Sequence, residues 1–232
     1  MKKTQILALG ILAISAVLFG SCDCDKPSPG PDDFLKNPSV KGAVNESGIE
    51  INKGTTPPAL AGTYLTDGEI VDASYLLDDL IGVSINTEFE LYNQTISGKI
   101  SFRETVGGFT FSGIGGYITG NSGKFTIYGE SRQSGSEAGL PNDLSINVVL
   151  LMSGVKLSNG DLSAVKGISV ITEVKTSNKS YGDVKSIEGN WWMWEADFDL
   201  QTGLKSTNGS QASQSMKEIM QFVVSKLTSD HP

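Results

Sequence analysis

Three tryptophans and three carboxylates stand close together between residues 191 and 199. In an extended strand the side chains alternate between two faces, so Trp192 and Trp194 share one face with Phe198. Such rings could hold a sugar ring or the apolar body of a small ligand, and Trp191 on the other face is a third candidate. The alternative for Trp192 and Trp194, which we favour, is a closing strand packed into a core.

The three acids, Glu195, Asp197 and Asp199, fall on the same face as Trp191. Three carboxylates at this spacing could bind calcium, and two could act as acid and base in glycoside hydrolysis. We favour a solvated face of an acidic protein instead. The sequence therefore predicts no metal site, no catalytic residue and no cofactor.

The remaining composition excludes several kinds of chemistry. The single histidine is His231, one residue from the end, which leaves no imidazole for a packed catalytic or zinc site. Without residues 1–21, which carry two lysines and no acid, the chain has 16 basic and 26 acidic side chains, a net charge of −10. Such a surface repels nucleic acid. The sequence thus predicts a protein that is not an enzyme and has no nucleic-acid partner.

The first residues predict export and attachment to a membrane. Lys2 and Lys3 precede an apolar stretch of signal-peptide length, and the small residues Gly20 and Ser21 come directly before Cys22. This pattern resembles the lipobox of bacterial lipoproteins, which implies cleavage after residue 21 and acylation of Cys22. The acids that follow resemble the surface-export signal of Bacteroidota lipoproteins, which favours the outer face of the outer membrane over its periplasmic face.

Residues 22–58 contain six of the eight prolines, which predicts an extended tether after the signal peptide of residues 1–21. Residues 59–232 instead show a pattern of short alternating apolar runs separated by turns rich in Gly, Asn and Ser. About eight antiparallel strands in up-and-down order would close into a barrel, so the predicted fold class is all-β. An apolar stripe after Ser215 adds an amphipathic helix over about residues 211–228.

A closer resemblance rests on the segment Gly62-Thr63-Tyr64 near the first strand, on the strand count and on the late helix. The chain is similar to lipocalin-like, or calycin, barrels, although these usually carry Gly-x-Trp where this chain has Tyr64. No ligand follows from this resemblance, because calycins hold very different ones. The alternating strands, the aromatic closing strand and the lack of a catalytic histidine or cysteine favour a binding module for a small apolar or glycan ligand, with Tyr64 and the three tryptophans as candidate ligand contacts. Two alternatives stay open: an interaction protein of the cell envelope without a small ligand, and a carboxylate-dependent polysaccharide hydrolase.

Overall fold

The computed structural model describes residues 30–106, 109–134, 140–177, 184–201, 219 and 221–226. Two helices, α1 (Pro31–Lys36) and α2 (Pro38–Ser47), precede the strands, and two 3₁₀ helices, η1 (Tyr75–Leu80) and η3 (Val184–Ile187), lie between strands. The strands are β1 (Gly62–Ala73), β2 (Ser84–Ile85), β3 (Glu88–Tyr92), β4 (Lys99–Val106), β5 (Phe109–Ser112), β6 (Ile114–Asn121), β7 (Lys124–Ser134), β8 (Leu144–Lys156), β9 (Leu162–Thr176) and β10 (Trp191–Leu200).

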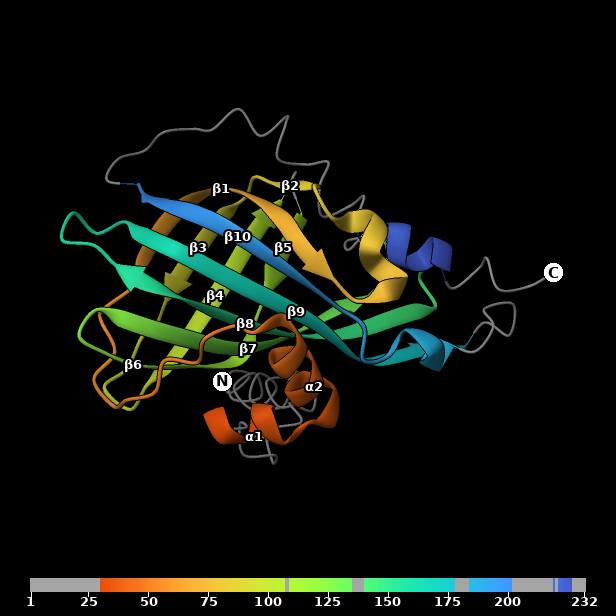
Figure 1. Ribbon diagram of the computed structural model, residues 1–232, viewed down its shortest axis with the longest axis horizontal. Helices are drawn as coiled ribbons and strands as arrows, with labels where there is room; N and C mark the ends of the chain where they lie inside the picture. The colour runs from red at the N-terminus through yellow and green to blue at the C-terminus, as the bar shows by residue number, and fades with distance from the viewer. Residues whose placement is uncertain are drawn as a thin grey trace, which may run out of the picture.

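The strands form a closed antiparallel barrel, as the sequence predicts (Figure 1). Eight of them, β1, β3, β4, β6, β7, β8, β9 and β10, follow one another around the sheet, and β10 closes the circle by pairing with β1. Two short strands add to this circle: β2 pairs with β1, and β5 pairs with β4. Closure pairs the edges that an open sheet would leave free.

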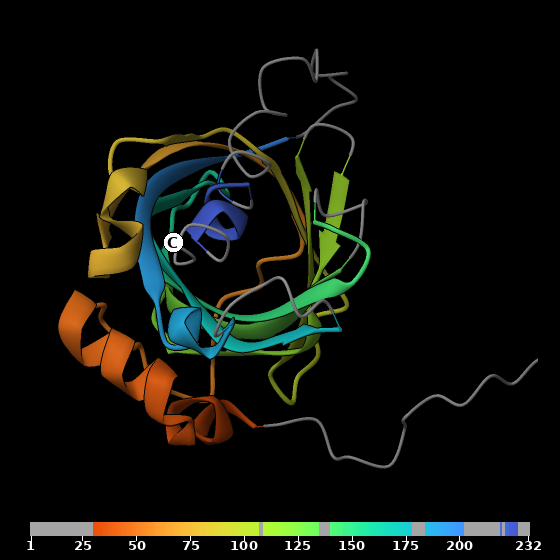
Figure 2. The same ribbon diagram turned by 90° about the vertical axis from the view of Figure 1, so that its right-hand side faces the viewer.

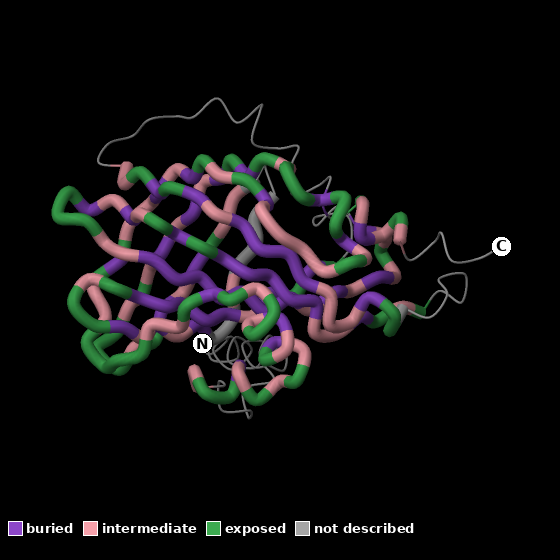
Figure 3. Tube along the Cα trace, viewed as in Figure 1, coloured by how far each residue is buried: buried purple, intermediate pink, exposed green. Residues whose placement is uncertain are grey.

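Buried and more exposed residues alternate along several strands (Figure 3), because successive side chains of a strand point to opposite faces of the sheet. On β8, Leu144, Ile146, Val148, Leu150 and Met152 all belong to the interior cluster, as the alternating pattern predicts. The interior is therefore a continuous apolar core that runs through all the strands of the circle.

The C-terminal helix lies at one end of the barrel (Figure 2). Ile219 and Val223 are buried in the same interior cluster as Leu77 of η1 and Ile187 of η3. Residues 219 and 221–226 are helical, which confirms that part of the predicted helix, and its other residues lie outside the described ranges. The helix thus packs on the domain and covers this end of the core.

Over residues 31–47 the structure has helices where an extended tether was expected for residues 22–58. Helices α1 and α2 pack against the outer face of the barrel, where Phe34, Val40 and Ala43 cover apolar side chains of the sheet. The outward-facing partners include Val149 and Leu151 on β8, Ile168 and Val170 on β9, and Trp191 and Met193 on β10. The folded part therefore begins well before residue 59. Among the described residues no helix is long and apolar enough to cross a membrane.

Candidate functional site: a cavity inside the barrel

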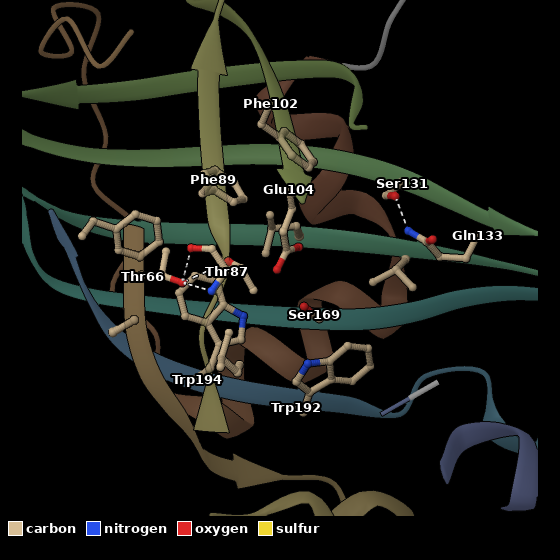
Figure 4. A pocket seen from close by; sticks show the side chains of 15 residues that line it. Thr66, Thr87, Phe89, Phe102, Glu104, Ser131, Gln133, Ser169, Trp192 and Trp194 are labelled. Atoms are coloured by element: carbon tan, nitrogen blue, oxygen red, sulfur yellow. Dashed lines mark hydrogen bonds between the residues drawn. The ribbon is translucent and has the colours of Figure 1, made fainter. Parts of the chain in front are cut away.

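A cavity lies inside the barrel, between β4 and β10 (Figure 4). About 710 Å³ there is not filled by atoms, including space open to solvent, and the centres of water molecules fit into about 60 Å³ of it. The space is therefore narrow, with room for several waters or for a slender organic molecule. Its lining residues are Thr66, Ile85, Thr87, Phe89, Phe102, Glu104, Ser131, Gln133, Val148, Leu150, Ser169, Trp192, Trp194, Ala196 and Phe198.

Aromatic rings form one part of the cavity wall. The rings of Phe89 and Phe102 stack with their centroids 5.7 Å apart, and Phe198 meets Phe89 edge-on at 5.8 Å. Trp194 continues this wall, with its ring 6.1 Å from Phe198. Gly167, the cross-strand neighbour of Trp194, makes room for the indole, because a Cβ atom there would lie 2.1 Å from its ring.

Two pairs of hydrogen-bonded polar side chains also line the cavity. The hydroxyl of Thr66 accepts a hydrogen bond of 2.9 Å from the backbone N–H of Thr87, and the two hydroxyls lie 3.0 Å apart. Across the cavity, Gln133 donates from its amide nitrogen to Ser131 over 2.6 Å. All four residues are buried, so their mutual bonds satisfy polar atoms that would otherwise be costly in an apolar interior.

Glu104 brings an ionisable group into this interior. It follows Ile100 and Phe102 at every second position of β4, so its side chain points inward with theirs. Burial raises the pKa of the Glu104 carboxyl to about 7, and a hydrogen bond with Thr87 opposes this rise. The side chain keeps some accessible surface because it faces the cavity. The carboxyl thus changes its charge near neutral pH.

The indole nitrogen of Trp192 is a second unusual polar group. Trp192 is 1% exposed and lines the cavity, and within the described part of the chain its Nε1 has no hydrogen-bond partner. A buried donor of this kind costs about 1–3 kcal/mol unless an acceptor reaches it. Its position on the cavity wall means that a bound molecule can supply that acceptor (Figure 4).

The structure brings two of the four candidate ligand residues to the cavity. Trp192 and Trp194 line it, whereas Tyr64 is packed in the core beside it, where its hydroxyl donates to the Leu60 carbonyl over 2.8 Å. Burial raises the pKa of Tyr64 to about 12. Trp191 lies on the outer face instead, under α2, and its Nε1 donates to Glu46 over 3.1 Å. Trp191 is therefore part of the helix–barrel packing and does not contact the cavity.

The acidic stripe lies on the outer face of β10, as the alternation predicts. Glu195 is paired there with Lys166 of β9, and Asp197 is exposed. No group of three acidic, histidine or cysteine side chains in the described ranges could hold a metal ion. The stripe thus lies outside the cavity and does not contribute to its chemistry.

Glu104 was not among the residues that the sequence analysis selected. The signal that could have found it is the continuation of the alternation from Ile100 and Phe102 to a carboxylate.

The predicted lipid attachment site, Cys22, lies outside the described residues. No known protein family matches this chain, and no curated protein or solved structure shows significant similarity to it.

Proposed function

We propose that this protein is an envelope lipoprotein whose barrel binds one small, largely apolar ligand. The observation that supports this most directly is the cavity inside the barrel, which aromatic and aliphatic side chains line together with a few polar groups. Small-molecule sites in proteins have this composition, because apolar walls provide affinity and a few polar atoms fix the orientation.

The attachment to the membrane is the second part of the proposal. Acyl chains on Cys22 would hold the barrel at the outer membrane, with the cell surface favoured over the periplasmic face. The lipobox-like residues before Cys22 and the acids after it support this part.

The kind of ligand follows from how the rings are buried. Trp192 and Trp194 are 1% and 7% exposed, so they form a wall and not an open platform for a polysaccharide chain. The narrow space favours a compact molecule with an aromatic or short aliphatic body. Among the two ligand classes expected from the sequence, the apolar one therefore has the better support.

The two alternative functions find less support. Four large apolar side chains are exposed in the described part: Tyr75 begins η1, Ile81 directly follows it, and Ile96 and Leu157 lie in separate loops. They are scattered, so they offer no broad surface for a protein partner. A carboxylate hydrolase of the type considered needs two acids across a cleft. Of the described residues that line the cavity, only Glu104 is acidic.

A cavity-filling variant tests the binding function. Val148 lines the cavity from β8, so Val148→Phe adds bulk to the space where the ligand would bind. We expect 2-phenylethanol or 2-naphthylmethanol to bind the unaltered protein with measurable affinity by calorimetry. The variant should bind them at least about tenfold more weakly, a loss of about 1.4 kcal/mol.

Two controls separate lost binding from lost folding. Ile96→Phe makes a similar change at a fully exposed position and should leave binding unaltered. Leu150→Phe fills the cavity from a second position and serves if Val148→Phe fails to fold, since overpacking costs about 1–3 kcal/mol. Unchanged affinity in folded Val148→Phe and Leu150→Phe proteins would refute binding in this cavity.

A further inference from the structure

The charge inside the cavity is unbalanced. Glu104 is the one titratable residue among the described residues that line it. The side chains that β1, β2, β3, β7, β8, β9 and β10 contribute to the lining are all uncharged. A buried carboxylate without a cation is costly, so this site favours a positive charge brought by a ligand.

The nearest cation along the strand does not meet this need. Arg103 precedes Glu104 and therefore points to the outer face, where it lies 3.3 Å from the Glu90 carboxylate. Its guanidinium group also lies 5.5 Å from the centroid of the Tyr92 ring. Arg103 thus interacts outside the barrel. Among the described residues that line the cavity, Glu104 has Thr87 as a hydrogen-bond partner but no cation beside it.

The rings beside Glu104 favour the same kind of ligand. Phe89 is the cross-strand partner of Glu104, and its ring stacks on that of Phe102. Aromatic faces attract cations, and they do so more strongly where water is excluded. A carboxylate next to stacked rings therefore suits an ammonium group that is attached to an apolar body.

From this geometry we infer that the cavity binds a small organic amine, whose ammonium group pairs with Glu104 while its apolar body lies against the aromatic wall. This inference rests on the proposed binding function and narrows it to one chemical class. An amine that also carries an acceptor oxygen would gain a further hydrogen bond, because the unpaired Trp192 Nε1 could donate to that oxygen. A fatty acid suits the cavity less well, because its carboxylate would be repelled by ionised Glu104.

Three probes of the same shape test the inference by calorimetry at about pH 8, where a carboxyl with a pKa of about 7 is largely ionised. The first, 2-phenylethylamine, carries a positive charge. The second, 2-phenylethanol, is neutral, and the third, 3-phenylpropionate, carries a negative charge. We expect the amine to bind at least about tenfold more tightly than the alcohol, and the propionate to bind most weakly. Glu104→Gln should remove the preference for the amine and change the affinity for the alcohol by less than about twofold.

The matched control is Glu69→Gln, which makes the same change on an exposed residue of β1 and should keep the preference. The amine affinity of the unaltered protein should also rise between about pH 5.5 and about pH 8 as Glu104 loses its proton, while the alcohol affinity stays constant. Equal binding of amine and alcohol, or tighter binding of the propionate, would overturn the inference and leave the binding function standing. Failure of all three probes to bind the folded protein would overturn both.

Discussion

Glu104 couples the folding of this protein to pH. The ordinary pKa of a glutamate is 4.5, and burial raises that of Glu104 to about 7 in the folded chain. Between about pH 4.5 and about pH 7, the Glu104 carboxyl therefore keeps a proton in the folded state that it has lost in the unfolded state. The stability that comes from the neutral carboxyl is present in full below about pH 4.5 and is lost as the pH rises through about 7.

Replacing Glu104 by glutamine should remove this dependence. Gln cannot ionise, so at about pH 8 we expect Glu104→Gln to raise the free energy of unfolding by on the order of 3 kcal/mol. At about pH 4 both proteins carry a neutral side chain there, and the difference should vanish. Urea denaturation at the two pH values measures both quantities. The exposed control Glu69→Gln should stay within about 0.5 kcal/mol, and an equal effect of Glu104→Gln at both pH values would contradict the argument.

At the level of single residues, the sequence predicted part of the site. The alternation along β10 assigns Trp192, Trp194 and Phe198 to one face, and this face lines the cavity. The same alternation places Trp191 on the opposite face, but it does not show that α2 covers this face. Glu104 was missed because strands with one wet face carry many carboxylates, and only the cross-strand pairing shows which of them point inward.

Helices α1 and α2 show how local chemistry overrides composition. A proline-rich segment predicts an extended tether, yet Pro31 and Pro38 each occupy the first turn of a helix, where proline is favoured. Asn37 caps α2 by accepting a hydrogen bond of 3.0 Å from the Ser39 N–H. Gly48 ends α2 with a φ angle of 65°, the left-handed conformation that glycine adopts readily. These signals were present in the sequence but were outweighed by its proline content.

A substitution in α1 tests whether these helices belong to the folded domain. Phe34 is buried against the barrel, with its ring centroid 6.0 Å from that of Tyr128. We expect Phe34→Ala to lower the free energy of unfolding of the purified protein by about 3 kcal/mol, because it leaves a cavity under the helix. The change should leave binding inside the barrel unaltered, since Phe34 lies on the other side of the sheet.

The control for this substitution is Tyr75→Ala, which removes an aromatic ring that is 86% exposed. It should change the free energy of unfolding by no more than about 0.5 kcal/mol. If Phe34→Ala had as little effect as Tyr75→Ala, residues 31–47 would behave as the tether that their composition suggests, and the packing of the helices on β8 and β9 would be refuted.

The strands were easier to predict than the helices, although one of them differs in orientation. The apolar pair Ile168 and Val170 on β9 suggests an inward face, but both residues lie under the helices outside the barrel. The inward positions there include Gly167 and Ser169. A bulge at Ala164, with a φ angle of 50°, shifts the register earlier in β9. Because both faces of β9 are covered, apolarity alone could not tell them apart.

The whole molecule covers its apolar surfaces on both sides of the sheet. The barrel interior forms one apolar cluster, and the contact between the helices and the outer face forms a second. The sequence predicts the barrel because every-other-residue apolarity is a local signal that all its strands share. It does not predict the cavity, since an unfilled space depends on how side chains from opposite strands fit together.

The net charge of residues 22–232 bears on the proposed attachment to a membrane. A chain with a charge of −10 is repelled by anionic headgroups, so electrostatics would not hold it at a lipid surface. Two or more acyl chains would do so, because each buried CH₂ group contributes about 0.8 kcal/mol. The proposed attachment through Cys22 would therefore provide the membrane affinity that the acidic surface lacks.

Cys22 and Cys24 provide a matched pair for testing this attachment. In cells that process bacterial lipoproteins and are fed a labelled fatty acid, we expect the label in the unaltered protein and in Cys24→Ser, but not in Cys22→Ser. The reason is that Gly20 and Ser21 give Cys22 the small residues that processing requires, whereas Asp23 stands directly before Cys24. Mass spectrometry should find the mature chain beginning at Cys22. Label that persists in Cys22→Ser, or a mature chain that still begins at Met1, would refute lipid attachment at this residue and leave the binding function of the barrel to be judged by the cavity variants alone.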